Sequence, residues 1–297
     1  MNRFCRLPVL DTGMPLIDYQ HMTNSSSDPQ NEWPVVLTIA GSDSGGGAGI
    51  QADLKTFSAL GVFGTSAITC VTAQNPEGVA GLQAVTGDMV LSQIKSVCDS
   101  FPVSVAKTGM LYSAEIIRVV AAEDIREGIP VLVVDPVMVA ASGARLLQAD
   151  AIDALKNELL PQARVVTPNL HEAEILCGHS ISSIDELRKA AREIGDHFDV
   201  ACVAKGGDLG GDEVIDVLYD EGEEYVFSAP RIRAAQTHGA GCAFSAALTA
   251  YLARRELMSS AVQLAKNYVY QALEQSLAIG RHQPLNFNWV SGVAVAE

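Results

Sequence analysis

Short apolar runs alternate with amphipathic stretches along most of the chain. Runs rich in β-branched residues, such as 35–40 and 131–134, are typical of buried strands. In the stretch 48–60, Ile50 and Leu54 recur at the spacing of a helix face. Strands that alternate with helices predict right-handed crossovers and an α/β fold with a mostly parallel sheet. The predicted strands are 35–40, 64–71, 103–108, 131–134, 164–166 and 200–204, and the helices between them are 48–60, 87–100, 113–127, 149–160 and 184–195.

The pattern changes late in the chain. Segments 213–219 and 224–228 flank a Glu-Gly pair, which predicts an antiparallel hairpin. The stretch 243–252 is apolar on nearly every face and therefore predicts a buried helix. A last long helix is expected over 260–279.

The two ends of the sequence differ from the rest. The tail 280–297 carries Phe287 and Trp289, and we expect it to pack on the body of the protein. Residues 1–34 are polar and turn-rich towards their end, as in a flexible extension. We therefore expect a single domain over 35–297.

Composition and charge narrow the classes of function. With 297 residues, of which 48% are hydrophobic, the chain can bury a large core. A net charge of −15 argues against nucleic acids and anionic membranes as partners. It does not exclude an anionic substrate, because the N-terminus of one helix can bind phosphate locally.

The cysteines give no sign of a disulfide framework or a zinc site. They are scattered and no C-x-x-C pair occurs. This usage fits a reducing compartment, and no apolar run approaches the roughly 20 residues of a membrane span. We therefore expect a cytoplasmic protein. The six positions are Cys5, Cys70, Cys98, Cys177, Cys202 and Cys242.

A glycine-containing stretch from Thr237 to Cys242 leads into the predicted buried helix. The start of a helix carries unpaired N–H groups and the positive end of the dipole, which suits an anion. Cys242 lies in the first turn, where a thiol pKa tends to fall. An anion hole beside an activatable side chain is what phosphoryl transfer requires. A glycine turn before a core helix, with Cys242 as a small hydrophobic residue, explains the stretch equally well.

The Gly-rich segment 41–49 follows the first strand. It does not fit the dinucleotide-binding pattern, because Ile50 replaces the last glycine, and it lacks the lysine of a P-loop. Asp53 falls on the apolar face of the next helix, so it either reaches water at the rim or accepts hydrogen bonds from a ligand. Gln74, after the second strand, can pair with a heterocycle or stabilise its own loop.

The later strands also end at polar or glycine-bearing positions. In open α/β sheets, ligands bind at the carboxyl ends of the strands. These ends are therefore expected to line one site. They are Gly109-Met110, Asp135-Pro136-Val137-Met138, Thr167-Pro168-Asn169 and Lys205-Gly206-Gly207.

Taken together, these motifs resemble the ribokinase-like kinases, and among them the hydroxymethylpyrimidine/phosphomethylpyrimidine kinases of thiamine biosynthesis. The resemblance covers roughly residues 35–286 and implies a three-layer α/β/α fold with a mostly parallel sheet and a late antiparallel hairpin. It also suggests a homodimer. The matching segments are 37–55, 71–75, 107–110, 135–138, 167–174, 205–207 and 238–242.

The resemblance implies a role for each matching position. The residues that would hold the aminopyrimidine are Gly41, Asp53, Gln74, Met110 and Val137. The catalytic residues would be the anion hole and the base that takes the hydroxymethyl proton: Gly239, Ala240, Gly241 and Cys242. Nucleotide-binding residues would be Asn169, Lys205 and Thr237, and magnesium-binding residues Asp135 and Glu172. ATP and Mg²⁺ are the implied cofactors.

The expected activity is ATP-dependent phosphorylation of hydroxymethylpyrimidine and then of its monophosphate to the diphosphate. Ala240 stands where the family usually has Thr, but alanine supplies the same backbone N–H. Ala141 and Ala144 stand where the family often has Lys and an acidic residue near the phosphates. The alternatives are a pyridoxal kinase, or a catalytically impaired protein that binds the pyrimidine.

Overall fold

The computed structural model describes residues 33–138, 147–148, 150–233 and 237–291. Within these residues the strands form one sheet in the order β3-β2-β1-β4-β5-β6-β7-β8-β9. The strands are β1 (Val35–Asp43), β2 (Phe63–Asn75), β3 (Gly78–Ala84), β4 (Val103–Thr108), β5 (Val131–Val134), β6 (Val165–Val166), β7 (Ala201–Lys205), β8 (Glu213–Asp220) and β9 (Glu223–Pro230). The α-helices are α1 (Gly49–Ala59), α2 (Gly87–Cys98), α3 (Ala114–Ala121), α4 (Glu123–Arg126), α5 (Ala151–Ala154), α6 (Leu170–Cys177), α7 (Ile184–Phe198), α8 (Ala240–Ala253) and α9 (Met258–Glu274).

The central strands of the sheet, in the order β2-β1-β4-β5-β6-β7, run parallel, as predicted. β1 pairs with β2 on one side and with β4 on the other, so the direction of the strand order reverses between β1 and β4. A reversal of this kind opens a crevice at the carboxyl ends of the two strands, where ligands bind in open α/β sheets. The fold therefore places the ends of β1 and β4 at the expected site.

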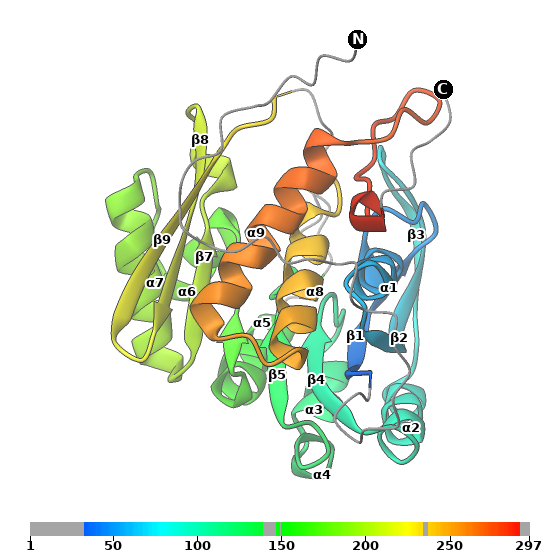
Figure 1. Cartoon of the computed structure of the whole chain (residues 1–297). Helices are drawn as coiled ribbons and strands as arrows, with labels where there is room; N and C mark the ends of the chain where they lie inside the picture. The colour runs from blue at the N-terminus through cyan, green and yellow to red at the C-terminus, as the bar shows by residue number, and fades with distance from the viewer. Residues whose placement is uncertain (1–32, 139–146, 149, 234–236, 292–297) are drawn as a thin grey trace, which may run out of the picture. The chain divides into compact units, whose positions relative to one another are not determined.

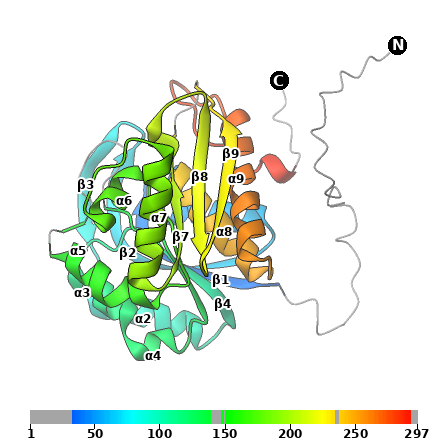
Figure 2. The same cartoon turned by 90° about the vertical axis from the view of Figure 1, so that its left-hand side faces the viewer.

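Helices cover both faces of the sheet and give the expected three layers (Figures 1 and 2). α1, α8 and α9 pack on one face with Val36, and α2, α3, α5 and α7 pack on the other with Leu37. Both of these neighbouring β1 side chains are fully buried. Because both faces are covered, the strands read as continuous apolar runs rather than as an alternating pattern.

The end of the chain follows the prediction, except that the last helix, α9, spans Met258–Glu274 rather than 260–279. β8 and β9 form an antiparallel hairpin, and α8 is buried along nearly its whole length. In the tail, the backbone carbonyl of Phe287 accepts a hydrogen bond from the Tyr268 hydroxyl at 2.7 Å. The Trp289 indole N–H donates to the Tyr268 carbonyl at 3.2 Å. The described part of the tail therefore packs on α9. None of the described helices is long and apolar enough to cross a bilayer.

Some elements differ from the prediction. β3 and α6 were not predicted, and β2 continues through the polar segment 72–75 that was expected to be a loop. The stretch 113–127 divides into α3 and α4 at Ala122, and 149–160 contains a π-helical segment, Leu155–Leu159. The expected extension before Trp33 and the positions of Ala141 and Ala144 lie outside the described residues.

Candidate active site

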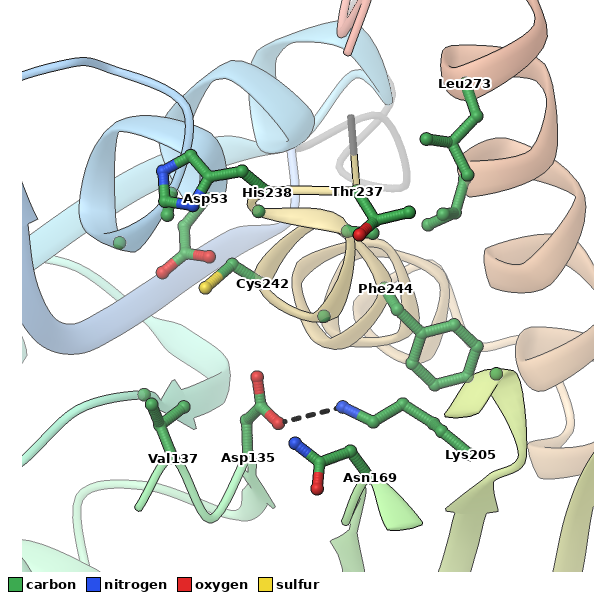
Figure 3. A pocket seen from close by; sticks show the side chains of 18 of the residues that line it. Asp53, Asp135, Val137, Asn169, Lys205, Thr237, His238, Cys242, Phe244 and Leu273 are labelled. Carbon is green, nitrogen blue, oxygen red and sulfur yellow. Dashed lines mark hydrogen bonds and ion pairs between the residues drawn. The ribbon is translucent and has the colours of Figure 1, made fainter. Parts of the chain in front are cut away.

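A pocket of roughly 730 Å³ lies over the carboxyl ends of the parallel strands. That volume suits a small-molecule ligand. Every residue that the sequence predicted for the site lines this pocket, from Gly41 on β1 to Cys242 on α8. Figure 3 shows the strand-end residues Asp135, Asn169 and Lys205 facing the start of α8. The structure therefore brings the predicted residues together, and their individual roles remain predictions.

The anion-hole loop (residues 237–242) depends on glycine at one position. Gly239 has φ of +84°, and a Cβ there would lie 1.7 Å from the Gly47 carbonyl oxygen. The Ala240 N–H, which the sequence assigned to the anion hole, donates to the Thr237 carbonyl at 3.0 Å. The N–H groups that this helix start offers to an anion are therefore the next ones, from Gly241 and Cys242.

Cys242 points into the pocket between Asp53 and Asp135 (Figure 3). Burial, together with the two carboxylates, raises the pKa of its thiol to about 11 against the opposing effect of Lys107. The expectation of a lowered pKa is therefore wrong. A helix N-terminus favours the thiolate, but here burial and two nearby negative charges outweigh it.

Asp53 is fully buried and ion-paired. Its Oδ1 lies 2.7 Å from the Lys107 Nζ, and its Oδ2 accepts a hydrogen bond from the Thr38 hydroxyl at 2.6 Å. Burial disfavours the Lys107 charge, but Asp53, together with Cys242 and Asp135, outweighs burial and raises the pKa of that ammonium. The alternative of a solvated rim carboxylate is thus excluded. The sequence analysis did not identify this partner, although a lysine inside the apolar strand 103–108 could have indicated it.

Asp43 organises the Gly-rich loop (residues 43–49), a role that the sequence analysis missed. Its Oδ1 accepts a hydrogen bond from the Gly45 N–H at 2.8 Å, and its Oδ2 from Ala48 at 2.8 Å and Gly47 at 3.1 Å. Burial raises the pKa of Asp43, but the contact with His238 and the backbone donors outweigh it and hold the pKa below its ordinary value. The signal was an aspartate directly before a glycine run, which is typical of side-chain-stabilised turns.

The far side of the pocket holds a charged cluster. The Lys205 Nζ donates to Asp135 Oδ1 at 3.2 Å, as the dashed line in Figure 3 marks. The Ser245 hydroxyl of α8 donates to Asp135 Oδ2 at 3.0 Å. Lys205 is thus held at the end of β7, where its ammonium can meet a phosphate.

Asn169 and Glu172 form a capping box at the start of α6. The Asn169 side chain accepts from the Glu172 N–H, and Glu172 accepts from the Asn169 N–H, both at 2.9 Å. Burial, together with the charge of Asp135, raises the pKa of Glu172 to about 7 against the opposing effect of Lys205. Both carboxylates are buried and line the same pocket, and carboxylate oxygens are the ligands that Mg²⁺ takes, so Asp135 and Glu172 fit this ion.

The opposite side of the pocket fits a flat heterocycle. A Cβ on Gly41 would lie 2.6 Å from the Met110 Cε, so only glycine leaves room there for that side chain. The Gln74 Oε1 accepts a hydrogen bond from the Thr72 hydroxyl at 3.1 Å, which orients the amide. Val137 adds an apolar contact surface (Figure 3).

The sequence analysis missed the wall formed by the hairpin and α9. This wall is mostly apolar, but it includes Lys266, whose Nζ lies 2.7 Å from Asp216 Oδ2. Nothing in the sequence separates these residues from ordinary core positions. The apolar members are Val214, Ala229, Pro230, Ile232, Val269 and Leu273.

One group with metal-ligand chemistry lies outside the pocket among the described residues. Cys177, His179 and Glu193 place their ligand atoms within 4.8 Å of one another. The His179 Nε2 already lies 2.7 Å from a Glu193 oxygen. A hydrogen-bonded ion pair accounts for this contact without a metal.

Comparison with known proteins finds relatives that are similar over most of the chain. The phosphomethylpyrimidine kinase family matches residues 43–286. The hydroxymethylpyrimidine/phosphomethylpyrimidine kinase of Bacillus subtilis is 44% identical, over 84% of this chain and 93% of that protein. Its Haemophilus influenzae counterpart is 46% identical, over 84% and 95%. The chain spans about half, 51%, of the thiamine biosynthesis bifunctional protein of Geobacter sulfurreducens, to which it is 45% identical.

Solved structures share the fold. The pyridoxal kinase of Staphylococcus aureus in complex with ADP is 35% identical with a TM-score of 0.79, covering 86% of this chain and 94% of that one. The phosphomethylpyrimidine kinase of Clostridium difficile 630 is 39% identical with a TM-score of 0.71, covering 80% and 98%. With a family match over residues 43–286 and 44–46% identity to relatives of similar length, the chain belongs to the phosphomethylpyrimidine kinase family.

Proposed function

We propose that this protein transfers a phosphoryl group from ATP to hydroxymethylpyrimidine, and a second one to the resulting monophosphate, in thiamine biosynthesis. The observation that carries the proposal is the arrangement of one pocket. Its Gly41 and Gln74 side suits an aminopyrimidine, its Lys205 side suits phosphates, and Cys242 with the start of α8 lies between them.

In this arrangement the reacting hydroxyl lies next to Cys242. The sulfur, once deprotonated, accepts the hydroxyl proton as the oxygen attacks the γ-phosphorus. The bond between this phosphorus and the β–γ bridging oxygen breaks, and ADP leaves. The Gly241 and Cys242 N–H groups stabilise the charge on the phosphoryl oxygens, and the Lys205 ammonium neutralises nucleotide phosphate. Asn169 and Thr237 border the same part of the pocket.

Mg²⁺ is assigned to the Asp135 and Glu172 side. When bound, the ion would supply positive charge that neutralises the nucleotide phosphates. The two buried carboxylates would hold it, and the Lys205 contact with Asp135 keeps one of them in place. We also expect a homodimer in the cytoplasm, as the family resemblance suggests.

A pyridoxal kinase is the second candidate, because the solved pyridoxal kinase of Staphylococcus aureus aligns over 86% of this chain. That enzyme has also been solved with AMP-PCP and pyridoxal. Both substrates are flat heterocycles with a hydroxymethyl group. Turnover with each alcohol, at the same Mg-ATP concentration, separates the two candidates.

The deciding experiment is mass analysis of the products formed from Mg-ATP and hydroxymethylpyrimidine. Monophosphate followed by diphosphate supports both steps. Monophosphate alone limits the activity to the first step and directs attention to the segment around Ala141 and Ala144. No phosphorylated pyrimidine contradicts the proposal; pyridoxal phosphate would then identify the second candidate. Pyrimidine binding without turnover would identify a catalytically impaired binding protein.

A further inference from the structure

Two loops that are distant in the sequence meet beside Cys242. The Gly-rich loop follows β1, and the anion-hole loop precedes and begins α8. The His238 Nε2 lies 3.1 Å from the Asp43 Oδ2, a contact between residues 195 positions apart. The side chains are 19% and 2% exposed, so water screens this interaction only partly.

The backbones of the two loops also fit closely. A Cβ on Gly239 would lie 1.7 Å from the Gly47 carbonyl oxygen. A Cβ on Gly47 would lie 2.9 Å from the His238 Cδ2. Glycine at both positions therefore allows the loops to approach closely enough for the His238–Asp43 contact.

The Gly-rich loop carries this contact to the catalytic thiol. The same Asp43 oxygen that faces His238 accepts hydrogen bonds from the Gly47 and Ala48 N–H groups. The next residue, Gly49, begins α1, and its N–H lies close enough to the Cys242 sulfur to lower the pKa of that thiol. The chain of contacts thus runs from the residue that begins the anion hole, through Asp43, to the sulfur itself.

We propose that His238 and Asp43 form a latch that closes the Gly-rich loop over Cys242 and holds the Gly49 N–H against its sulfur. They are positioning residues, because they act on the reaction through Cys242. The inference deepens the proposed function and rests on it in taking Cys242 as the base. A closed latch aligns the sulfur with the substrate hydroxyl and limits water around it. An open latch leaves a thiol that is more accessible but poorly aligned.

The test measures turnover and thiol reactivity together. In His238→Leu, we expect kcat to fall about tenfold, the KM for ATP to stay within about twofold, and iodoacetamide to alkylate Cys242 about tenfold faster. Peptide mass mapping distinguishes Cys242 from the other cysteines. A merely structural defect would not combine a slower enzyme with a faster-reacting thiol and an unchanged KM for ATP.

Further variants and a matched control complete the design. His238→Gln can place an amide donor near the lost Nε2, so we expect partial recovery of both rates. Asp43→Asn should shift both rates in the same direction as His238→Leu. Outside the pocket, the Arg188 Nε lies 2.6 Å from the Glu224 Oε1 in an ion pair. Arg188→Leu breaks this pair and should change neither the turnover nor the alkylation rate.

The outcomes separate the latch from the proposed function. If iodoacetamide alkylates Cys242 in His238→Leu at the same rate as in the wild type, the latch is overturned, whatever happens to kcat. Absence of pyrimidine phosphorylation by the wild-type protein would contradict the proposed function. The alkylation rates would still decide the latch, because alkylation requires neither ATP nor pyrimidine. If circular dichroism shows that His238→Leu is unfolded, His238→Gln and Asp43→Asn decide it.

Discussion

Lys107 and Asp53 form an ion pair of 2.7 Å beneath the pocket, with neither side chain exposed to solvent. Removing one partner leaves an uncompensated buried charge, which costs about 3–5 kcal/mol. We therefore predict that Lys107→Met lowers the free energy of unfolding by about 3–5 kcal/mol, measured by urea denaturation.

The exposed pair of Arg118 and Glu158 is the control for this prediction, since its atoms lie at 3.0 Å on the surface. Arg118→Met should cost less than about 1 kcal/mol. Replacing both Lys107 and Asp53 by apolar residues should restore part of the lost stability, because no unpaired charge then remains. A Lys107→Met protein as stable as the wild type would show that the buried pair is not required for folding.

The pH dependence of turnover should report the thiol of Cys242. Burial raises its pKa to about 11, so at neutral pH most molecules hold the proton. Below the pKa, the thiolate fraction rises about tenfold per pH unit. We expect kcat/KM to rise between about pH 7 and pH 9, measured as a pH–rate profile. Cys98→Ser, outside the pocket, should keep this profile, whereas a flat wild-type profile would argue against Cys242 as the base.

Glu172→Gln separates the charge of this side chain from its structural role. Gln can still accept the Asn169 N–H hydrogen bond of the capping box, but it cannot attract a cation as strongly. We predict an increase of about tenfold in the Mg²⁺ concentration for half-maximal rate, with little change in melting temperature. Glu174→Gln, on the same helix but outside the pocket, should leave the Mg²⁺ requirement unchanged.

The same residue links the Mg²⁺ requirement to pH. The pKa of Glu172 is raised to about 7, so this carboxylate gains a proton as the pH falls through that value. The wild-type Mg²⁺ requirement should therefore increase on acidification. In Glu172→Gln this increase should be smaller. Equal pH dependence in the two proteins would remove Glu172 from the proposed cation site.

Gly239→Ala tests the contact between the two loops. Gly239 and Gly210 both have positive φ, +84° and +80°, but only Gly239 has atoms within 4 Å of an added Cβ. Gly210→Ala should therefore cost only the backbone strain, about 1–3 kcal/mol, and leave activity unchanged. Gly239→Ala should lower kcat about a hundredfold, because the anion-hole donors must move. Similar activities in the two variants would contradict this view of the loop.

The strands were predictable where burial on both faces leaves a continuous apolar run, as in Val131–Val134. β3 was missed because most of its side chains are exposed and it contains glycine, so it depends on pairing with β2 rather than on a pattern of its own. α6 was missed because it has only eight residues and a weak apolar face. Its capping box was nevertheless visible as Asn169 followed by Glu172.

The site was predictable residue by residue but not contact by contact. The position of Asp53 on a helix face indicated burial, yet its partner Lys107 lies 54 positions away. The contact of Asp43 with His238 spans 195 positions. It forms only because the fold brings the end of β1 to the start of α8. The prediction of a lowered pKa for Cys242 was wrong because a local rule about helix ends includes neither burial nor the carboxylates that other strands and helices bring close.

The capping box also affects how relatives of this protein can be interpreted. Asn169 and Glu172 satisfy each other's backbone at the start of α6, so they would still stabilise this helix in a descendant that had lost phosphoryl transfer. Cys242 caps no helix, and another small residue could take its place in the first turn of α8. In such a descendant, loss of catalysis would therefore become visible first at Cys242, while the asparagine and glutamate remained.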